Sequence, residues 1–534
     1  MSAPPIALAR WLVDAGAGVS ARRVLGDLRG APANQVRLQA DRAALRPGVF
    51  ALVALPDGRG LALPLVASPG RPRAKDEAFR EACSAAHACV RELLDATSLP
   101  SLRFELEEEL AIFGSSIGLA AALAFLAHFM PSRAPDRAVL ATGRLLDDGR
   151  VVDVGHRNAK AEIAAAERGA RWCLFPAGAE VAGADVVPVS TLAEAAARVL
   201  GPAPWRADPD LWAVDDLLRR ARTAGDPLEG ITLLDALPLE PLAAADRVRV
   251  LFDLGTLHRN RGDSRRARDL HERARELLGP VRLVVGSDIA ERYDLELAAS
   301  ALDDLEVDGT VAWLRRRLGE PFLRARNELR CRGMLAQGLS ISGAFAEALA
   351  VREGNLALHE RSAALARSLP MTLCQLAIDA AFAGDAEAFE RHVARLASVT
   401  LPGEDLQERW SAGAIVRGLV ALGRGAEALA WAEDRRRIHA MRVPPTFAET
   451  ARGEGPIASQ PELTAARSLV RALRGAGEID RALRLAERAL AAQDGLTNLF
   501  RWTAALVRLE QALALLAGGR EDAARDAFER AKQA

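Results

Sequence analysis

The sequence is poor in aromatic residues, in net charge and in paired cysteines. Aromatics make up 4% of its 534 residues, and the formal net charge is −1 at pH 7. Few aromatics leave few platforms for stacking nucleic-acid bases, and no basic excess indicates a nucleic-acid partner. The cysteines are odd in number and form no Cys-x-x-Cys pair, so we expect reduced, buried thiols: Cys83, Cys89, Cys173, Cys331 and Cys374.

Lysine is almost missing as well. Among 70 Lys and Arg residues, the lysines are Lys75, Lys160 and Lys532. The sequence contains no Gly-x-x-x-x-Gly-Lys-[Ser/Thr] motif, so it carries no P-loop ATPase module. It also contains no His-Glu-x-x-His motif or other ligand cluster, so no metal or other cofactor is implied. Residues 1–19 lack a basic region followed by a long apolar stretch, so we expect no secretory signal and a cytoplasmic protein.

Residues 1–203 read as a domain of short strands and helices. Val49–Leu55 and Leu61–Val66 flank Pro-Asp-Gly-Arg-Gly, whose composition predicts a turn and hence a β-hairpin. Further strands are expected at 102–106, 138–141, 151–154, 172–175 and 185–189, and helices at 76–94, 116–129, 159–168 and 192–200. Strands that alternate with helices predict an α/β or α+β domain. The uncharged stretch Leu110–Met130 is long enough to span a bilayer, but a helix buried in a globular core fits its flanks better.

Residues 206–534 read as an all-α helical solenoid. Gly201-Pro-Ala-Pro-Trp205 cannot continue a helix, and strand signals almost vanish beyond it. Small and large residues recur around Gly262, with weaker copies around Gly343, Gly384 and Gly423 and clear copies around Gly477 and Gly519. This spacing resembles tetratricopeptide repeats, in which glycine takes the turn between two packed helices. A generic helical array is the alternative, and either architecture favours binding of a protein partner.

One serine motif carries candidate chemistry. Gly114-Ser-Ser-Ile-Gly118 fits Gly-x-Ser-x-Gly, which also marks the nucleophile elbow of α/β-hydrolases. That fold needs a histidine base and an acid in a strand–loop setting, and His128 and His156 are poor candidates. Lysine is the other possible base, because a buried lysine can lose its proton whereas arginine cannot. Lys160 follows Ser116 across a strand–turn–strand unit.

Residues from about 100 to 177, which include Ser116 and Lys160, resemble the proteolytic domain of Lon proteases, an α+β fold. That family carries Gly-Pro-Ser-Ala-Gly with a nucleophilic serine, which Ser116 matches. Thr142-Gly143 matches its strand ending in Thr-Gly. Archaeal-type members carry their catalytic lysine in Val-Gly-Gly-Val-Thr-Ala-Lys. The corresponding segment here is Val154-Gly-His-Arg-Asn-Ala-Lys160, so Lys160 stands at the position of that lysine.

The resemblance implies serine hydrolysis with a lysine base. Neutral Lys160 would accept the proton of Ser116 as its hydroxyl attacks a peptide carbonyl. Thr142 would hydrogen-bond the lysine and orient it, and helix N-terminal amides would stabilise the oxyanion. The chain departs from the family pattern at four positions, namely Phe113, Ser115, Arg144 and His156, and Ser115 is a competing nucleophile.

These observations predict an ATP-independent Ser/Lys endopeptidase whose substrate or regulator is chosen by the helical array. The expected partners are a protein or peptide substrate and a protein on the array, with no nucleic acid and no membrane, and an oligomer is possible. The rival interpretation is an inactive Lon-like fold joined to a repeat scaffold that only binds. A small-ester or amide hydrolase that uses the same two residues is a third.

Overall fold

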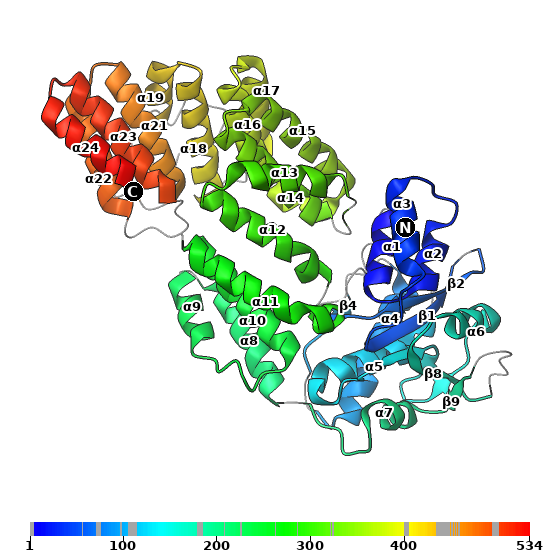
Figure 1. Cartoon of the computed structure of the whole chain (residues 1–534). Helices are drawn as coiled ribbons and strands as arrows, with labels where there is room; N and C mark the ends of the chain where they lie inside the picture. Colours follow the sequence, from blue (N-terminus) through cyan, green and yellow to red (C-terminus); the bar gives the residue numbers. More distant parts are fainter. Residues whose placement is uncertain are drawn as a thin grey trace.

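The computed structural model divides the chain into an α/β part and a long helical array (Figure 1). It describes residues 5–55, 57–70, 76–96, 99–104, 115–178, 185–207, 209–224, 227–261, 263–285, 287–320, 322, 325–399, 405–433, 449, 452, 454, 457, 460–493 and 501–533. Lys75, Phe113, Gly114 and Gly262 lie outside these ranges.

A five-stranded sheet, in the order β2-β1-β5-β8-β9, forms the centre of the first part. Its strands are β1 (Gly48–Ala54), β2 (Gly60–Pro64), β5 (Ala138–Ala141), β8 (Ala170–Pro176) and β9 (Val187–Val189). The hairpin β1–β2 is antiparallel, and β1, β5, β8 and β9 run parallel to one another. All four residues of β5 are completely buried, as expected for a central parallel strand that is covered on both faces.

Short strands and helices complete this part. Two small ribbons pair β3 (Ala67–Pro69) with β4 (Leu102–Phe104) and β6 (Arg144–Leu145) with β7 (Val151–Val152). The helices are α1 (Pro5–Asp14), α2 (Gly18–Leu25), α3 (Ala31–Ala40), α4 (Glu77–Leu93), α5 (Gly118–Phe129), α6 (Arg157–Ala166) and α7 (Leu192–Leu200), with short 3-10 turns η1 (Ser115–Ile117) and η2 (Pro131–Arg133). The sequence pattern anticipates β4, β7 and α4 to α7, but not β3, β6 or α1 to α3.

Helix α2 is capped from a distant part of the chain. No side chain next to its N-terminus provides a cap. Instead, the buried carboxylate of Glu167 accepts hydrogen bonds from the Ser20 amide (2.7 Å), the Ser20 hydroxyl (2.6 Å) and the Val19 amide (3.3 Å). A carboxylate at a helix N-terminus accepts hydrogen bonds from amides that have no partner within the helix. Its negative charge is also stabilised by the positive end of the helix dipole. Glu167 therefore ties the N-terminal helices to the segment that follows α6.

The second part consists of antiparallel helix pairs that pack on their neighbours. The helices are α8 (Pro209–Thr223), α9 (Pro227–Asp235), α10 (Ala244–Asn260), α11 (Ser264–Val285), α12 (Ser287–Asp303), α13 (Val307–Leu318), α14 (Ala325–Ile341), α15 (Phe345–Arg361), α16 (Leu369–Phe382), α17 (Ala386–Val399), α18 (Asp405–Ala421), α19 (Gly425–Glu433), α21 (Gln460–Gly475), α22 (Ile479–Gln493), α23 (Arg501–Ala517) and α24 (Glu521–Gln533), with η3 (Ala363–Ser368) before α16.

Glycine turns join these pairs, as the sequence predicts. Gly343, Gly384, Gly423, Gly477 and Gly519 all adopt left-handed φ angles between 70° and 82°. In each turn two backbone hydrogen bonds close the helix end; for example, Asp385 N donates to Ala380 O and Gly384 N to Ala381 O. This Schellman arrangement needs a left-handed residue, which is why glycine recurs. Five residues later comes a buried side chain that packs the next helix: Ala348, Phe389, Ala428, Ala482 and Ala524.

Leu305 makes the same turn without glycine. Its φ is 62°, and Glu306 N and Leu305 N donate to Ala301 O and Leu302 O. The α12–α13 pair is therefore a further unit of the array, which the sequence pattern misses because leucine stands where glycine is expected. The spacing after Gly519 places Phe528 at a packing position of the last unit, but its side chain is 42% exposed.

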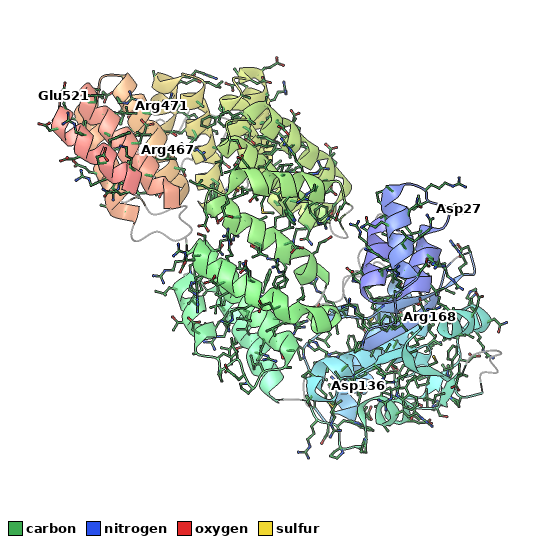
Figure 2. The ribbon with its side chains drawn as sticks, viewed as in Figure 1. Asp27, Asp136, Arg168, Arg467, Arg471 and Glu521 are labelled. Carbon is green, nitrogen blue, oxygen red and sulfur yellow. The ribbon has the colours of Figure 1, made fainter. Side chains whose placement is uncertain are left out.

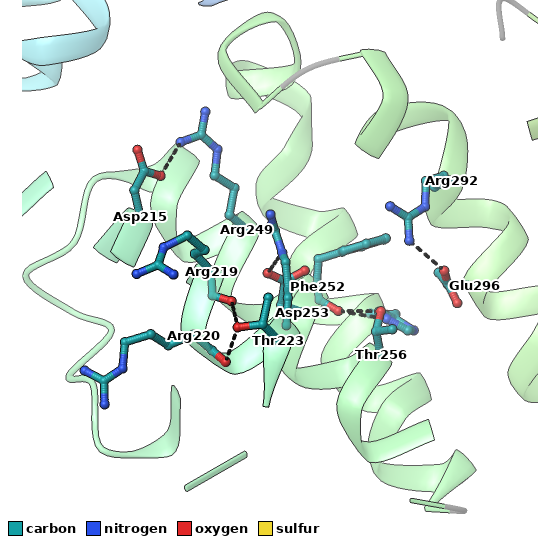
Figure 3. Close-up of polar contacts among 12 residues, drawn as sticks. Asp215, Arg219, Arg220, Thr223, Arg249, Phe252, Asp253, Thr256, Arg292 and Glu296 are labelled. Atoms are coloured by element: carbon teal, nitrogen blue, oxygen red, sulfur yellow. Dashed lines mark hydrogen bonds and ion pairs between the residues drawn. The ribbon is translucent and has the colours of Figure 1, made fainter. Parts of the chain in front are cut away.

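Among the described residues, ionisable side chains of the two parts meet at two places. Arg10 on α1 contacts Glu320 after α13 at 2.9 Å, and His128 near the end of α5 lies 3.7 Å from Asp215 on α8. Asp215 in turn approaches Arg249 on α10 at 3.8 Å (Figure 3). Helix α5 thus packs in the core of the α/β part and touches the array at its C-terminal end. Among the described helices, none combines the length and apolar character needed to cross a membrane.

Candidate active site

Ser116 lies at the carboxyl end of β5. It sits in η1, the turn that leads into α5, and is partly buried. Its carbonyl oxygen accepts hydrogen bonds from the Gly143 amide at 3.0 Å and from the Thr142 hydroxyl at 3.4 Å. Leu119 N in turn donates to Gly143 O at 3.0 Å. These bonds attach the serine segment to the residues that follow the central strand, the edge at which parallel sheets place functional groups.

Two glycines permit this close approach. A Cβ on Gly118 would lie 2.8 Å from the Leu145 backbone nitrogen, which a packed side chain cannot do. Gly143 has a φ of 152°, and a Cβ there would lie 2.6 Å from Val151 Cγ1. The second glycine of the Gly-x-Ser-x-Gly motif and the glycine of Thr142-Gly143 are therefore both required by local packing.

Lys160 is buried in α6. The residue is 2% exposed, and its neighbour Ala159 packs so closely on β2 that a Cβ on Gly60 would lie 2.2 Å from the Ala159 carbonyl oxygen. No hydrogen bond or ion pair joins Nζ to any residue that the structure describes. Burial lowers the pKa of Lys160 to about 8, because the ammonium form loses its hydration without gaining a counter-charge. A solvated lysine at the start of a helix is excluded.

His156, which stands where Lon-like sequences have a second glycine, retains the backbone conformation that glycine favours. Its φ is 60° and ψ is 37°, in the left-handed region that histidine tolerates better than most residues. It precedes α6, and its side chain is exposed. The substitution therefore changes the side chain at this turn while preserving the path of the chain toward Lys160. An open hollow surrounds this turn, lined by Gly58, Glu162 and residues 153–159.

The expected site residues are brought together only in part. Thr142, which is fully buried, bonds to the Ser116 carbonyl and not to Lys160, so its hydroxyl orients the serine segment rather than the amine. Within the described residues, no hydrogen bond links Ser116 Oγ to Lys160 Nζ. Ser116 does not cap the following helix either, since no side chain caps α5. Its neighbour Ser115 is partly buried too.

Neither histidine can serve as a base for Ser116 in the manner of an α/β-hydrolase. His128 occupies the other end of α5, where its Nε2 faces Asp215 of the array. His156 is exposed before α6. The link between His128 and Asp215 is a contact that sequence reasoning misses, because nothing in the spacing of two residues on different parts of the chain indicates that they meet.

Comparison with known proteins identifies no family. No family model matches the chain, and no curated protein matches it. Solved structures do match. A Rap protein complexed with competence and sporulation factor is 10% identical, with a TM-score of 0.43, over 61% of this chain and 87% of its own. The apo quorum sensor NprR from B. thuringiensis is 12% identical, with a TM-score of 0.39, over 61% and 86%. The TPR domain of P58(IPK) is 13% identical, with a TM-score of 0.18, over 61% and 93%.

Proposed function

We propose that this protein is an ATP-independent serine endopeptidase in which Ser116 is the nucleophile and Lys160 the general base, on a Lon-like fold, with the helical array selecting the substrate or a regulator. The observation that supports the proposal most is the burial of Lys160. A buried ammonium group without a counter-charge is expensive, and such groups are concentrated at functional sites. Its pKa of about 8 leaves a useful neutral fraction near neutral pH, which a general base requires.

The chemistry would proceed by acyl transfer. Ser116 Oγ would attack the substrate carbonyl carbon while Lys160 Nζ accepts the hydroxyl proton, and the resulting ammonium would return that proton to the leaving amine. Water would then attack the acyl-enzyme with the same lysine as base. Attachment of the Ser116 carbonyl to Thr142 and Gly143 would hold the nucleophile still, and amides in the first turn of α5 would lie close to the developing oxyanion.

The test is a profile of new protein N-termini in a lysate of the source cells. We expect the wild-type protein to produce new N-termini. The rate at which they form should fall by about a thousandfold or more in Ser116→Ala and in Lys160→Met. The matched controls are Ser115→Ala, one residue away in the same turn, and Lys532→Met, an exposed lysine on α24. Products that persist in Ser116→Ala, or that vanish in Ser115→Ala, would contradict the assignment of the nucleophile.

A second candidate function is an interaction scaffold without catalysis. The lack of a hydrogen bond between Ser116 Oγ and Lys160 Nζ favours it, although catalytic hydrogen bonds often tighten only when substrate binds. A scaffold would capture the same partners, uncut, with the wild-type chain and with Ser116→Ala. Partner capture followed by cleavage in the wild-type protein alone would exclude this reading.

A further inference from the structure

The last helix pair of the array, α23–α24, leaves apolar side chains uncovered. Figure 1 shows this pair at the end of the array that lies away from the α/β part. Leu513 and Leu516 on α23 are 37% and 55% exposed, and Phe528 on α24 is 42% exposed. Helical arrays generally end in a pair whose outer face is polar, because an apolar end would otherwise face water. This end of the array departs from that pattern.

The same positions are covered in the preceding pairs. Nine residues after the turn glycine, where the last pair has Phe528, three earlier pairs have buried side chains: Val393, Ala432 and Ala486. Three residues before the glycine, where the last pair has Leu516, two earlier pairs are also buried: Ala381 and Val420. In the next pair this position is Arg474, which approaches Glu510 of α23 at 3.6 Å. The uncovered face of α23–α24 is therefore the face on which an array packs its next helices.

Four exposed residues form one stripe along α24. Glu521, Arg525, Phe528 and Lys532 follow one another at intervals of three or four residues, which places them on the same side of a helix. Figure 2 shows Glu521 at the outer edge of the array. Glu521 and Arg525 form no ion pair with a residue that the structure describes. Lys532 contacts only its own helix in this region, with Nζ 2.8 Å from Glu529 and 4.9 Å from the centre of the Phe528 ring.

This stripe is complementary to its own reverse. From the N-terminus it reads acidic, basic, aromatic, basic. A second copy of α24 that runs antiparallel would place Glu521 opposite Lys532 and Arg525 opposite Phe528. Because a two-fold axis repeats each contact, two ion pairs and two cation–π contacts would form. A parallel copy would instead set Glu521 against Glu521 and Lys532 against Lys532.

We propose that the end face of α23–α24 binds a second copy of this chain, in a two-fold dimer whose α24 helices lie antiparallel across the axis. Helix α23 packs beside α24, so the same axis places the two α23 helices opposite each other and covers Leu513 and Leu516. The two arrays would join end to end, with an α/β part at each far end. The interface does not involve Ser116 or Lys160, so it stands or falls separately from the proposed peptidase activity.

The experiment is sedimentation equilibrium of the full chain from about 1 to 100 µM. We expect the average mass to rise from 57.0 kDa toward twice that value as concentration increases. Phe528→Asp should weaken association by about a hundredfold or more, because a two-fold dimer contains the substitution twice and loses two apolar contacts. Leu38→Asp is the matched control, since Leu38 is a 69% exposed leucine on α3, and it should associate as the wild type does.

An exchange of charges tests the antiparallel register. Glu521→Lys and Lys532→Glu should each weaken association by about tenfold, because each sets like charges against each other at two places. The chain that carries both substitutions should associate as the wild type does, since the ion pairs form again with their signs reversed. Local destabilisation of α24 in a single variant would not produce this rescue. Asp526→Lys is the control, because Asp526 is exposed and stands two residues from Phe528, on the other side of the helix.

Three results would overturn the proposal. A wild-type chain that stays at 57.0 kDa up to about 100 µM would leave this face to a different protein. Association that Phe528→Asp does not weaken would place the contact between copies elsewhere. A mass that grows beyond two copies, or a double exchange that does not restore dimers, would exclude the antiparallel two-fold arrangement.

Discussion

The ionisation of Lys160 is the sharpest prediction that the structure offers. Its pKa of about 8, against the usual 10.5, corresponds to about 3 kcal/mol, because each pKa unit equals about 1.4 kcal/mol of differential interaction. For a lysine with a lowered pKa, the unfolded chain binds more protons between pH 8 and 10.5. The free energy of unfolding should therefore rise with pH across this window, and the full penalty should be present below pH 8.

The scarcity of lysine makes the measurement direct. Labelling lysine side chains with carbon-13 gives signals from Lys75, Lys160 and Lys532 alone, and Lys160→Met identifies the one of interest. We expect its Cε shift to titrate with a midpoint near 8. Lys160→Met should also stabilise the α/β part at pH 7 by about 3 kcal/mol, since it removes a buried charge and retains an apolar stem of similar length.

Two results would refute this reasoning. A Lys160 midpoint near 10.5 would mean that the ammonium group is hydrated or paired in solution. The second is hydrogen exchange of the β1 and β5 amides at pH 7 that is no slower in Lys160→Met than in the wild type. That result would mean that burial of the Lys160 ammonium group does not destabilise the fold. Lys532→Met should change stability by less than about 0.5 kcal/mol, because that lysine is exposed beside Glu529.

Further predictions concern activity and stability. Peptide cleavage should rise as pH increases through about 8, where Lys160 becomes neutral, and level off above; a rate independent of pH from 6.5 to 9.5 would contradict a lysine base. Leu305→Gly should stabilise the array by about 1 kcal/mol in chemical denaturation, whereas Leu305→Ala should not, because only glycine relieves the left-handed φ of 62°. Gly118→Ala should destabilise the α/β part by about 2 kcal/mol and abolish cleavage, since the new Cβ would meet Leu145 N, whereas Gly475→Ala, which meets nothing, should be tolerated. Glu167→Ala should cost about 2 to 3 kcal/mol and increase hydrogen exchange at the start of α2, with Glu162→Ala, an exposed neighbour, as the control.

Much of the fold follows from local signals in the sequence. The β1–β2 hairpin is readable because Asp57 and Gly58 form a turn between two apolar runs. The helix pairs of the array are readable because glycine marks a left-handed turn. Where another residue takes that conformation, as at Leu305, the signal disappears although the structure is the same. Helix α1 also ends in such a turn, at Gly16 with a φ of 83°, but α2 depends on a cap from Glu167, which no local pattern encodes.

The sequence predicts which residues belong to the candidate site but not how they are arranged. Spacing and resemblance single out Ser116, Thr142 and Lys160, and local structure accounts for Gly118 and Gly143. Burial of Lys160 is a property of how α6 packs on β1 and β2, so the same residue could have been a solvated lysine. The hydrogen bond from Thr142 to the Ser116 carbonyl depends on how η1 packs against the end of β5. The linear sequence does not predict this packing either.

Helix α5 belongs to both parts of the molecule at once. Its first turn follows Ser116, and its last turn carries His128 against Asp215 of the array. With 12 residues it measures about 18 Å, as a rigid and almost wholly buried rod. One helix therefore connects the contact with α8 to the segment that carries Ser116. A change in the position of α8 would reach the edge of the sheet through displacement of this helix.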